Sequence, residues 1–438
     1  MRVLLLHPPI GRDLPPNQRT DNLSICYIAA VLKRDGHEVE VLDSAVMGLG
    51  PRETINAVLA RNFDCLGITS THEQKDFFVK LVRSVRARRK DALLIAGGYL
   101  ATLSAYKLLT ICPEVDLLIR GEGEAVTSEV FSKLAHGEDC RSTPGIAYIK
   151  DGKPVINPMP PLIADLDTIP FPDRTSLVAG PKEMQVSIAA SRGCYHRCSF
   201  CCINSFYELS GGHAPRFRSP ASFVDEIESI VETTGRKDFM IIDDDFIGPG
   251  PKMRARAAQI GDEIRSRKLG ITFSIECRAD EIDEDLLKLL KEAGLTGVFL
   301  GIESGVQRQL DIFNKQLTVE QNVRALEMAR STGINVKAGL ILLDPYTTIT
   351  EVEEAQRFIR ENQLSSLSLE SRVKLYPGVP LAEKVRADGL LIERDGIDLD
   401  YRFKDPTVGL MHRVTKTSAA VSDSVKAMKS RFGLGGKR

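Results

Sequence analysis

Three cysteines stand close together in the segment Ser191-Arg-Gly-Cys-Tyr-His-Arg-Cys-Ser-Phe-Cys201. Cys194, Cys198 and Cys201 follow the spacing C-x3-C-x2-C, and no fourth cysteine follows at a matching interval. Cysteine thiolates are the usual ligands of iron–sulfur clusters, so this segment can hold three irons of a [4Fe–4S] cube. The fourth iron would stay open, and an open iron can bind and reduce a small molecule.

Two other interpretations of these cysteines remain open at this point. A structural zinc site takes four ligands from Cys and His, and His196 and His213 lie within or beyond the segment. Buried thiols with no ligand are the second alternative. Cys202 directly follows the third cysteine and would point the other way on an extended chain, so we interpret it as a neighbour.

The first 140 residues alternate short apolar strands with helices, which is typical of a doubly wound α/β domain with a parallel sheet. Ligands bind such sheets at the carboxyl ends of the strands, where we expect turns at 69–73, 97–102 and 121–124. We expect strands at 2–7, 38–42, 65–70, 92–96 and 115–120, and helices at 24–35, 51–61, 73–88 and 125–135.

Residues 141–185 change character, with a hairpin at 147–156 and then a proline-rich stretch that reads as a linker. From 186 to 380 the alternation resumes, and 381–438 reads as a mixed C-terminal extension. Six strand–helix units suit a partial (β/α)6 barrel, whose chemistry lies at the strands' C-terminal ends. We expect its strands at 185–190, 239–243, 272–277, 297–301, 336–343 and 367–375.

The bulk composition limits the class of protein. The chain has 438 residues, a formal net charge of −1 and nine cysteines, with 43% hydrophobic residues. We therefore expect two or three domains, no nucleic-acid partner, and a reducing cytoplasmic location. No apolar run is long enough to serve as a signal peptide or to cross a bilayer, so we expect no membrane partner.

The whole chain resembles the cobalamin-binding-domain radical S-adenosylmethionine (SAM) proteins. The cysteine motif, with Phe200 before its last cysteine, is the most specific part of the resemblance. The other matching pieces are His7-Pro-Pro, 27–43, 64–69, Gly97-Gly, Arg120-Gly-Glu-Gly-Glu124, Ile242-Asp-Asp-Asp-Phe246, Gly301-Ile-Glu-Ser304 and Gly378-Val-Pro380. The resemblance implies a Rossmann-like N-terminal domain, a radical SAM barrel and an external electron donor of the flavodoxin or ferredoxin type.

The resemblance also implies roles for single residues of the barrel. Cys194, Cys198 and Cys201 would ligate the cluster, and the backbone around Phe200 would meet the adenine of SAM. The residues that would hold the rest of SAM are Asp243, Asp244, Asp245, Arg278, Glu303 and Gly339.

Each of these SAM contacts has a chemical reason and an alternative. One of the three adjacent aspartates would accept the SAM amino group, because three adjacent carboxylates repel one another unless a cation or ligand is present. Arg278 would pair with the SAM carboxylate and Glu303 with the ribose hydroxyls. Gly339 would allow close backbone approach. A turn cap for the aspartates and a surface ion pair for Arg278 remain the alternatives.

A cobalamin site is implied at the strand ends of the first domain, where small residues leave room for a corrin ring. The candidate cobalamin-binding residues are Thr69, Ser70, Gly97, Gly98, Gly121 and Gly123. The sequence departs from the family pattern at Leu100, where many members have a histidine two residues after the double glycine. The D-x-H-x-x-G motif is absent as well.

Three functions remain in competition. The first is C-methylation of a small-molecule natural product by a cobalamin-dependent radical SAM enzyme, with one SAM used for the radical and another to remethylate cobalamin. The second is dehydration, epimerisation or oxidation of a sugar or aminoglycoside without cobalamin. The third is a non-catalytic sensor. The candidate catalytic residues are Cys277, Tyr207 and Tyr376, each of which is more often a packing residue, together with Glu276. The other carboxylates near predicted strand ends are Glu303, Asp344 and Glu370.

Overall fold

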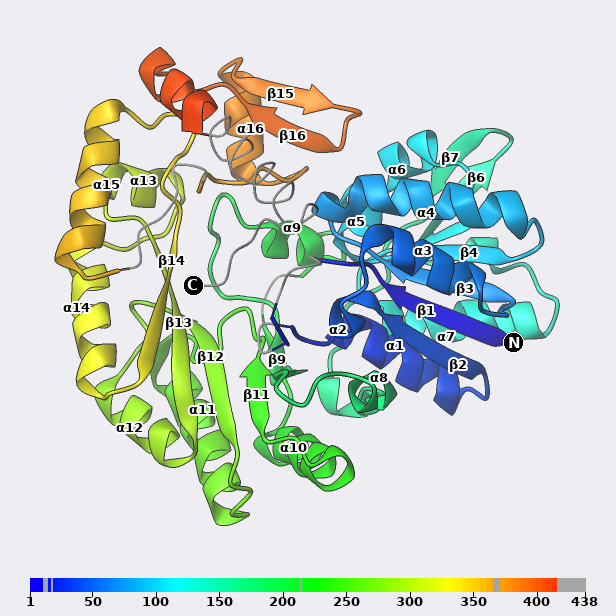
Figure 1. Cartoon of the computed structure of the whole chain (residues 1–438), viewed down its shortest axis with the longest axis horizontal. Helices are drawn as coiled ribbons and strands as arrows, with labels where there is room; N and C mark the ends of the chain where they lie inside the picture. The colour runs from blue at the N-terminus through cyan, green and yellow to red at the C-terminus, as the bar shows by residue number, and fades with distance from the viewer. Residues whose placement is uncertain (11–14, 17–18, 213–214, 365–370, 416–438) are drawn as a thin grey trace, which may run out of the picture.

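The structure is a computed structural model that describes residues 1–10, 15–16, 19–212, 215–364 and 371–415. Two α/β lobes lie side by side, an N-terminal lobe coloured blue to cyan and a barrel lobe coloured green to yellow (Figure 1). The short helix α9 (Cys202–Glu208) lies between them, and a C-terminal hairpin lies at the top of the view.

The N-terminal lobe is built on a seven-stranded sheet of order β2-β1-β3-β4-β5-β6-β7. Its first five strands are parallel, and their order is the flavodoxin-like 2-1-3-4-5, which confirms the doubly wound fold. The strands are β1 (Arg2–His7), β2 (Glu38–Asp43), β3 (Cys65–Thr69), β4 (Leu93–Gly97), β5 (Leu117–Ile119), β6 (Ile146–Lys150) and β7 (Lys153–Ile156).

Helices cover both faces of this sheet because alternate strand residues point to opposite sides. Val3 and Leu5 of β1 pack with α1 (Leu23–Arg34) and α7 (Gly123–Ala135). Leu4 and Leu6 pack on the other face. The helices of that second face are α3 (Pro51–Leu59), α4 (Lys75–Arg88), α5 (Gly98–Leu103) and α6 (Ala105–Ile111).

Two segments of this lobe differ from the sequence-based expectation. The stretch 97–102, expected as a turn, begins helix α5, because Gly98 has φ of +87° and directs the chain into the helix within one residue. The hairpin of β6 and β7 does not stand apart from the first domain, because Ile119 of β5 pairs with Ile146 of β6 and so extends the sheet.

The barrel lobe contains a five-stranded parallel sheet of order β14-β13-β12-β11-β8. Its strands are β8 (Val186–Ile188), β11 (Asp238–Ile241), β12 (Thr272–Arg278), β13 (Leu295–Glu303) and β14 (Asn335–Leu340). The sixth expected strand lies partly outside the described residues, and its described part pairs with Leu343 through Arg372. This arrangement agrees with the expected partial barrel.

Helices pack on the outer face of this sheet, following the predicted alternation (Figure 1). They are α10 (Pro220–Thr234), α11 (Gly250–Ser266), α12 (Glu284–Glu292), α14 (Val319–Ser331) and α15 (Ile349–Glu361). Their ends are set by local signals, since Ser219 caps α10 and Pro220 occupies its first position.

The described part of the C-terminal extension includes α16 (Pro380–Ala387), β15 (Leu391–Arg394), β16 (Asp398–Tyr401) and helical residues from 406 to 415. The tip of its hairpin docks on the N-terminal lobe, where Ile397 is buried in the same core as β1 and α4. Lys75 of α4 is buried there and pairs with Asp395 and Asp398. Within the described residues, no helix is both long and apolar enough to cross a bilayer.

Candidate active site

The cysteine loop connects β9 (Ser191–Arg192) to α9 and lies at the C-terminal end of the barrel sheet. Backbone contacts hold it in place. Ser199 N donates to Phe313 O at 2.8 Å, and Ser199 Oγ donates to Ile312 O at 2.6 Å. Asn204 Nδ2 donates to His196 O at 2.7 Å. The loop is therefore shaped by the protein chain itself.

The three cysteines of this loop fit a [4Fe–4S] cluster. They are free thiols that are neither fully buried nor fully exposed. Burial raises the pKa of Cys194 to about 12 and also raises the pKa values of Cys198 and Cys201. Thiolates in this place need nearby positive charge, which the irons of a cluster supply. Cys202 stands apart from this set, because it begins α9 and packs against the core of the C-terminal region.

The three adjacent aspartates have three different surroundings. Asp243 is buried and accepts hydrogen bonds from Ala190 N at 2.7 Å and Ser191 Oγ at 2.5 Å. It therefore ties the ends of β8 and β11 together. Asp245 is buried beside His196, 3.7 Å from Nε2. Asp244 accepts one bond, from Gly193 N at 3.0 Å, and lines a cavity between the lobes.

Asp244 is thus the aspartate that faces ligand space. By surface area Asp244 is exposed, because it opens onto the cavity, although protein groups crowd around its carboxylate. Burial, together with the neighbouring carboxylates Asp243 and Glu276, raises the pKa of Asp244 to about 7, although Gly193 N opposes this shift. Asp244 is therefore the aspartate for which we keep the prediction of a ligand contact.

Arg278 and Glu303 already have partners at the strand ends. Arg278 Nε donates to Asp280 at 3.0 Å, its Nη2 donates to Lys315 O at 2.6 Å, and its Nη1 lies 3.9 Å from Cys198 Sγ. Glu303 accepts from Lys315 Nζ at 3.0 Å. Both lie close to the cysteine loop, and each keeps hydrogen-bonding capacity beyond these partners.

Gly339 and Phe200 serve packing in the structure. A Cβ at Gly339 would lie 2.7 Å from Phe299 Cζ, so the glycine leaves room for that ring. Phe200 makes an edge contact with Phe313 at 5.1 Å between ring centroids. A cofactor contact at these two residues stays a prediction.

A cavity of about 350 Å³ lies between the strand ends of the N-terminal lobe and the cysteine-bearing lobe. The structure brings all six predicted cobalamin-binding residues to its wall, together with residues of the barrel lobe. The predicted residues are Thr69, Ser70, Gly97, Gly98, Gly121 and Gly123, and the barrel-lobe residues are Ala189, Ser191, Arg192, Phe206, Tyr207, Ile242 and Asp244.

Glycines in the wall of this cavity allow neighbouring strand ends to pack closely together. A Cβ at Gly98 would lie 2.8 Å from Ser70 O, and one at Gly67 would lie 2.6 Å from Leu5. The cavity reaches inward along apolar side chains, including Val3, Leu5 and Ile95. These residues fit a large planar group with an inserted tail, as cobalamin requires. Leu100, found where many members have histidine, is fully buried and packs in the N-terminal core.

Sequence reasoning did not predict the charged residues that join the two lobes at this cavity. Arg192 pairs with Glu122 at 3.0 Å and with Glu124 at 2.5 Å. Arg216, beside Arg192 across β9 and β10 (Arg216–Phe217), pairs with Glu122 at 2.7 Å. The two glutamates belong to the motif Arg120-Gly-Glu-Gly-Glu124, but their partner Arg192 lies about 70 residues later in the chain, so the sequence did not show the pairing.

The four candidate catalytic residues have unequal access to the cavity. Tyr207 lines it, and Arg216 lies over its ring at 5.3 Å. Tyr376 lies at the lobe interface, where its hydroxyl donates to Glu73 at 2.9 Å. Glu276 is half-buried on β12, and burial raises its pKa. Cys277 belongs to the apolar core of the barrel and is not among the cavity-lining residues.

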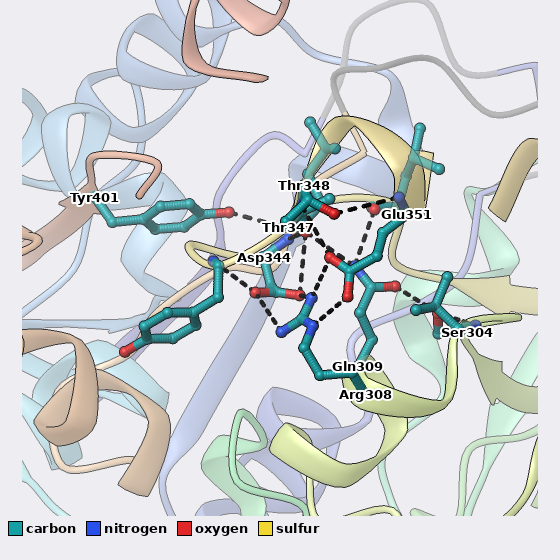
Figure 2. A network of polar contacts seen from close by, with 12 residues as sticks. Ser304, Arg308, Gln309, Asp344, Thr347, Thr348, Glu351 and Tyr401 are labelled. Atoms are coloured by element: carbon teal, nitrogen blue, oxygen red, sulfur yellow. Dashed lines mark hydrogen bonds and ion pairs between the residues drawn. The ribbon is translucent and has the colours of Figure 1, made fainter. Parts of the chain in front are cut away.

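Asp344 is fully buried in a network of polar contacts and is not among the residues that line the cavity (Figure 2). Arg308 reaches both Asp344, at 2.7 Å, and Glu351. Gln309 and Thr347 complete the network, with Gln309 Nε2 donating to Thr347 Oγ1 at 3.0 Å. The second acidic candidate, Glu370, and the possible zinc ligand His213 lie outside the described residues.

Two family models match this chain in the order that the fold shows. The B12 binding domain matches residues 16–131, and the radical SAM superfamily matches residues 188–359. The chain belongs to the radical SAM enzymes that carry a B12-binding domain. Membership assigns SAM and a [4Fe–4S] cluster to the barrel lobe and cobalamin to the N-terminal lobe.

Named relatives extend over most of the chain. A protein of Pyrococcus horikoshii named as an uncharacterized methyltransferase is 26% identical over 424 residues, covering 94% of this chain and 88% of its own. The anaerobic magnesium-protoporphyrin IX monomethyl ester cyclase of Rubrivivax gelatinosus is 31% identical, covering 82% of this chain and 66% of its own.

A solved structure has the same fold along the whole chain. The cobalamin-dependent SAM radical enzyme OxsB, with aqua-cobalamin and SAM bound, superposes with a TM-score of 0.81 at 19% identity. The match covers 100% of this chain and 69% of OxsB.

Proposed function

We propose that this enzyme methylates an unactivated carbon of a small molecule. The observation that carries the proposal is the shared cavity, in which Gly98 and Gly121 of the N-terminal lobe face Asp244 of the barrel lobe. When bound, the cluster supplies the electron that cleaves SAM to a hydrogen-abstracting radical, and cobalamin supplies the methyl group. A substrate carbon in this cavity would be within reach of both lobes.

The chain's own residues position these two activities. Arg192 lies two residues before Cys194 and pairs with Glu122 and Glu124, so one side chain connects the cysteine loop to the cobalamin-type wall. Tyr99 and Phe206 contact each other across the lobes, with ring centroids 5.0 Å apart, and both line the cavity. Asp244 offers one carboxylate to a hydroxyl or amino group of substrate or SAM.

We further propose that the enzyme works in the reducing cytoplasm on a natural-product type of substrate. All nine cysteines are free, as in a reducing compartment. An external flavodoxin- or ferredoxin-type protein would supply the electron. Dehydration, epimerisation or oxidation without cobalamin would leave the large cavity without a role, so we do not favour that alternative.

The test is to reconstitute the cluster anaerobically, add hydroxocobalamin, desalt, and measure metals per chain. Stoichiometric cobalt and about four irons are expected. Incubation with SAM and a low-potential reductant should then give S-adenosylhomocysteine only when cobalamin is present. Iron without cobalt, or S-adenosylhomocysteine formed equally without cobalamin, would overturn the methyltransferase proposal.

A further inference from the structure

A buried cluster of one histidine and two carboxylates lies beneath the cysteine loop. His196 lies within the loop between Cys194 and Cys198, Asp245 follows β11, and Glu281 follows β12. His196 Nε2 is 2.6 Å from Glu281 Oε1 and 3.7 Å from Asp245 Oδ2. The three ligand-type atoms all lie within 4.8 Å of one another.

The two carboxylates are deeply buried and incompletely satisfied. The side chains of Asp245 and Glu281 are 2% and 3% exposed. Asp245 Oδ2 and Glu281 Oε2 receive no hydrogen bond from any N–H or O–H donor of the described chain. A buried carboxylate oxygen without a donor or a cation carries a large desolvation cost, so these two oxygens must either share a proton or meet a cation.

The nearby basic side chains direct their donors elsewhere. Arg278 donates to Asp280 and to Lys315 O, and Lys315 donates to Glu303. Asp245 lies within hydrogen-bond reach of the Glu281 carboxyl and receives a long bond of 3.4 Å from Gly248 N on its other oxygen. One imidazole therefore lies beside two adjacent carboxylates, and within the described residues no ion pair joins either carboxylate to a guanidinium or ammonium group.

We propose that His196, Asp245 and Glu281 bind one first-row divalent cation, Mn²⁺, Fe²⁺ or Zn²⁺. One imidazole nitrogen and two carboxylate oxygens form a donor set that these ions accept. Metal–ligand bonds of about 2.0–2.2 Å place neighbouring ligand atoms about 3–4 Å apart. The present separations therefore need only a small opening of the His196–Glu281 contact. The site uses no cysteine and is separate from the cluster.

The cation would fix the cysteine loop to the barrel. It would connect the loop at His196 to the ends of β11 and β12 through Asp245 and Glu281. This positioning role does not depend on methyl transfer, so the site can be present in the enzyme whatever reaction it catalyses.

The test uses the reconstituted enzyme after removal of loosely bound metal with a chelator. Mn²⁺ is titrated and free Mn²⁺ is followed by electron paramagnetic resonance, while bound Zn²⁺ is counted by mass spectrometry after dialysis. One Mn²⁺ or Zn²⁺ per chain is expected in addition to the cluster iron. Asp245→Asn and Glu281→Gln should each weaken Mn²⁺ binding by at least about tenfold, as loss of a ligand-shell group does.

Matched measurements keep the outcome clear. Glu284 lies on the exposed face of α12 and pairs with Lys288 at 2.7 Å, so Glu284→Gln should leave Mn²⁺ binding unchanged. The charge-transfer absorbance of the cluster shows whether each variant is folded and loaded. Absence of a tight Mn²⁺ or Zn²⁺ site in the wild-type enzyme would overturn the proposal and would leave the carboxylates sharing a proton. Binding that is unchanged in both ligand variants would overturn it as well.

Discussion

Arg192 and Glu122 are separated by 70 residues in the chain, yet Arg192 Nη1 lies 3.0 Å from Glu122 Oε1. Glu122 belongs to the glycine-rich turn of the N-terminal lobe, and Arg192 precedes the cysteine loop of the barrel lobe. The ion pair is buried, with side chains 16% and 6% exposed. The position of the cysteine loop is therefore coupled directly to the wall of the cobalamin-type cavity.

Arg192→Met should destabilise the protein strongly, because it leaves Glu122 and Glu124 buried with less compensation. Removing one partner of a buried pair costs about 3–5 kcal/mol. The free energy of unfolding, measured by denaturant titration, checks this. Arg34→Met, at an exposed pair with Asp35, should change it by less than about 1 kcal/mol. Equal losses in the two variants would contradict the coupling.

Cys198→Ala should remove the cluster, while Cys202→Ala should keep it, although the two residues are only four positions apart. Cys198 belongs to the loop beside Arg278, and Cys202 packs at the start of α9. Iron per chain after reconstitution should fall from about four to near zero in Cys198→Ala. Full iron content in that variant, or loss of iron in Cys202→Ala, would show that the ligand set is assigned wrongly.

Gly98→Ala should weaken cobalamin binding, because the new Cβ would lie 2.8 Å from Ser70 O on the cavity wall. Gly137→Ala is the matched control, since Gly137 also has a left-handed φ of +71° but has nothing within 4 Å. Both substitutions carry a backbone cost of about 1 kcal/mol, so the difference between them reports the clash. Bound cobalt after desalting is the measurement, and equal cobalt in both would count against this position of the site.

The stability of the cofactor-free protein should fall as pH rises towards 8, in part through Asp244. Burial raises the pKa of this carboxyl to about 7, so between about pH 4 and 7 the folded state holds a proton that the unfolded state has released. Asp244→Asn cannot lose that proton. Its melting temperature should therefore decline less between pH 5 and pH 8 than that of the wild type. Parallel curves would show that Asp244 titrates normally.

Arg308→Met should disrupt the network of Figure 2, because Asp344 is fully buried and would lose its guanidinium partner. A loss of about 1–3 kcal/mol in the free energy of unfolding is expected, because the Arg308 side chain is 37% exposed and solvent screens part of the ion pair. Arg265→Met breaks an exposed ion pair with Glu292 and should cost less than about 1 kcal/mol. A small effect at Arg308 would mean that Asp344 is held mainly by Thr347 and its backbone contacts.

The elements could be predicted because their signals are local. The run Val3 to Leu6 is buried on both faces of the sheet and predicts β1 directly. Ser219-Pro220 is a typical start of a helix and marks the beginning of α10. Helices α5 and α9 were not predicted, since the first was interpreted as a glycine turn and no helix was expected at 202–208. Short helices next to ligand loops lack the apolar periodicity on which such predictions rest.

The site could be predicted only where function depends on spacing within one segment. The cysteine triad and the small residues of the cavity wall were identified from the sequence, and the structure gathers the latter in one place. The different surroundings of Asp243, Asp244 and Asp245 could not be read, because they depend on Ser191, Gly193 and Glu281. These contacts link distant segments, and no local pattern reports them.

The burial of Ile397 in the N-terminal core has a consequence for how the chain is made. The residues of β1 and α4 leave the ribosome first, but the last side chain of their core arrives more than 300 residues later. The first lobe to be synthesised is therefore among the last to be completed, and fragments that stop at the lobe boundary carry an open apolar gap. The contact of the C-terminal hairpin with the N-terminal lobe, and not the linker alone, therefore completes the core of the first lobe.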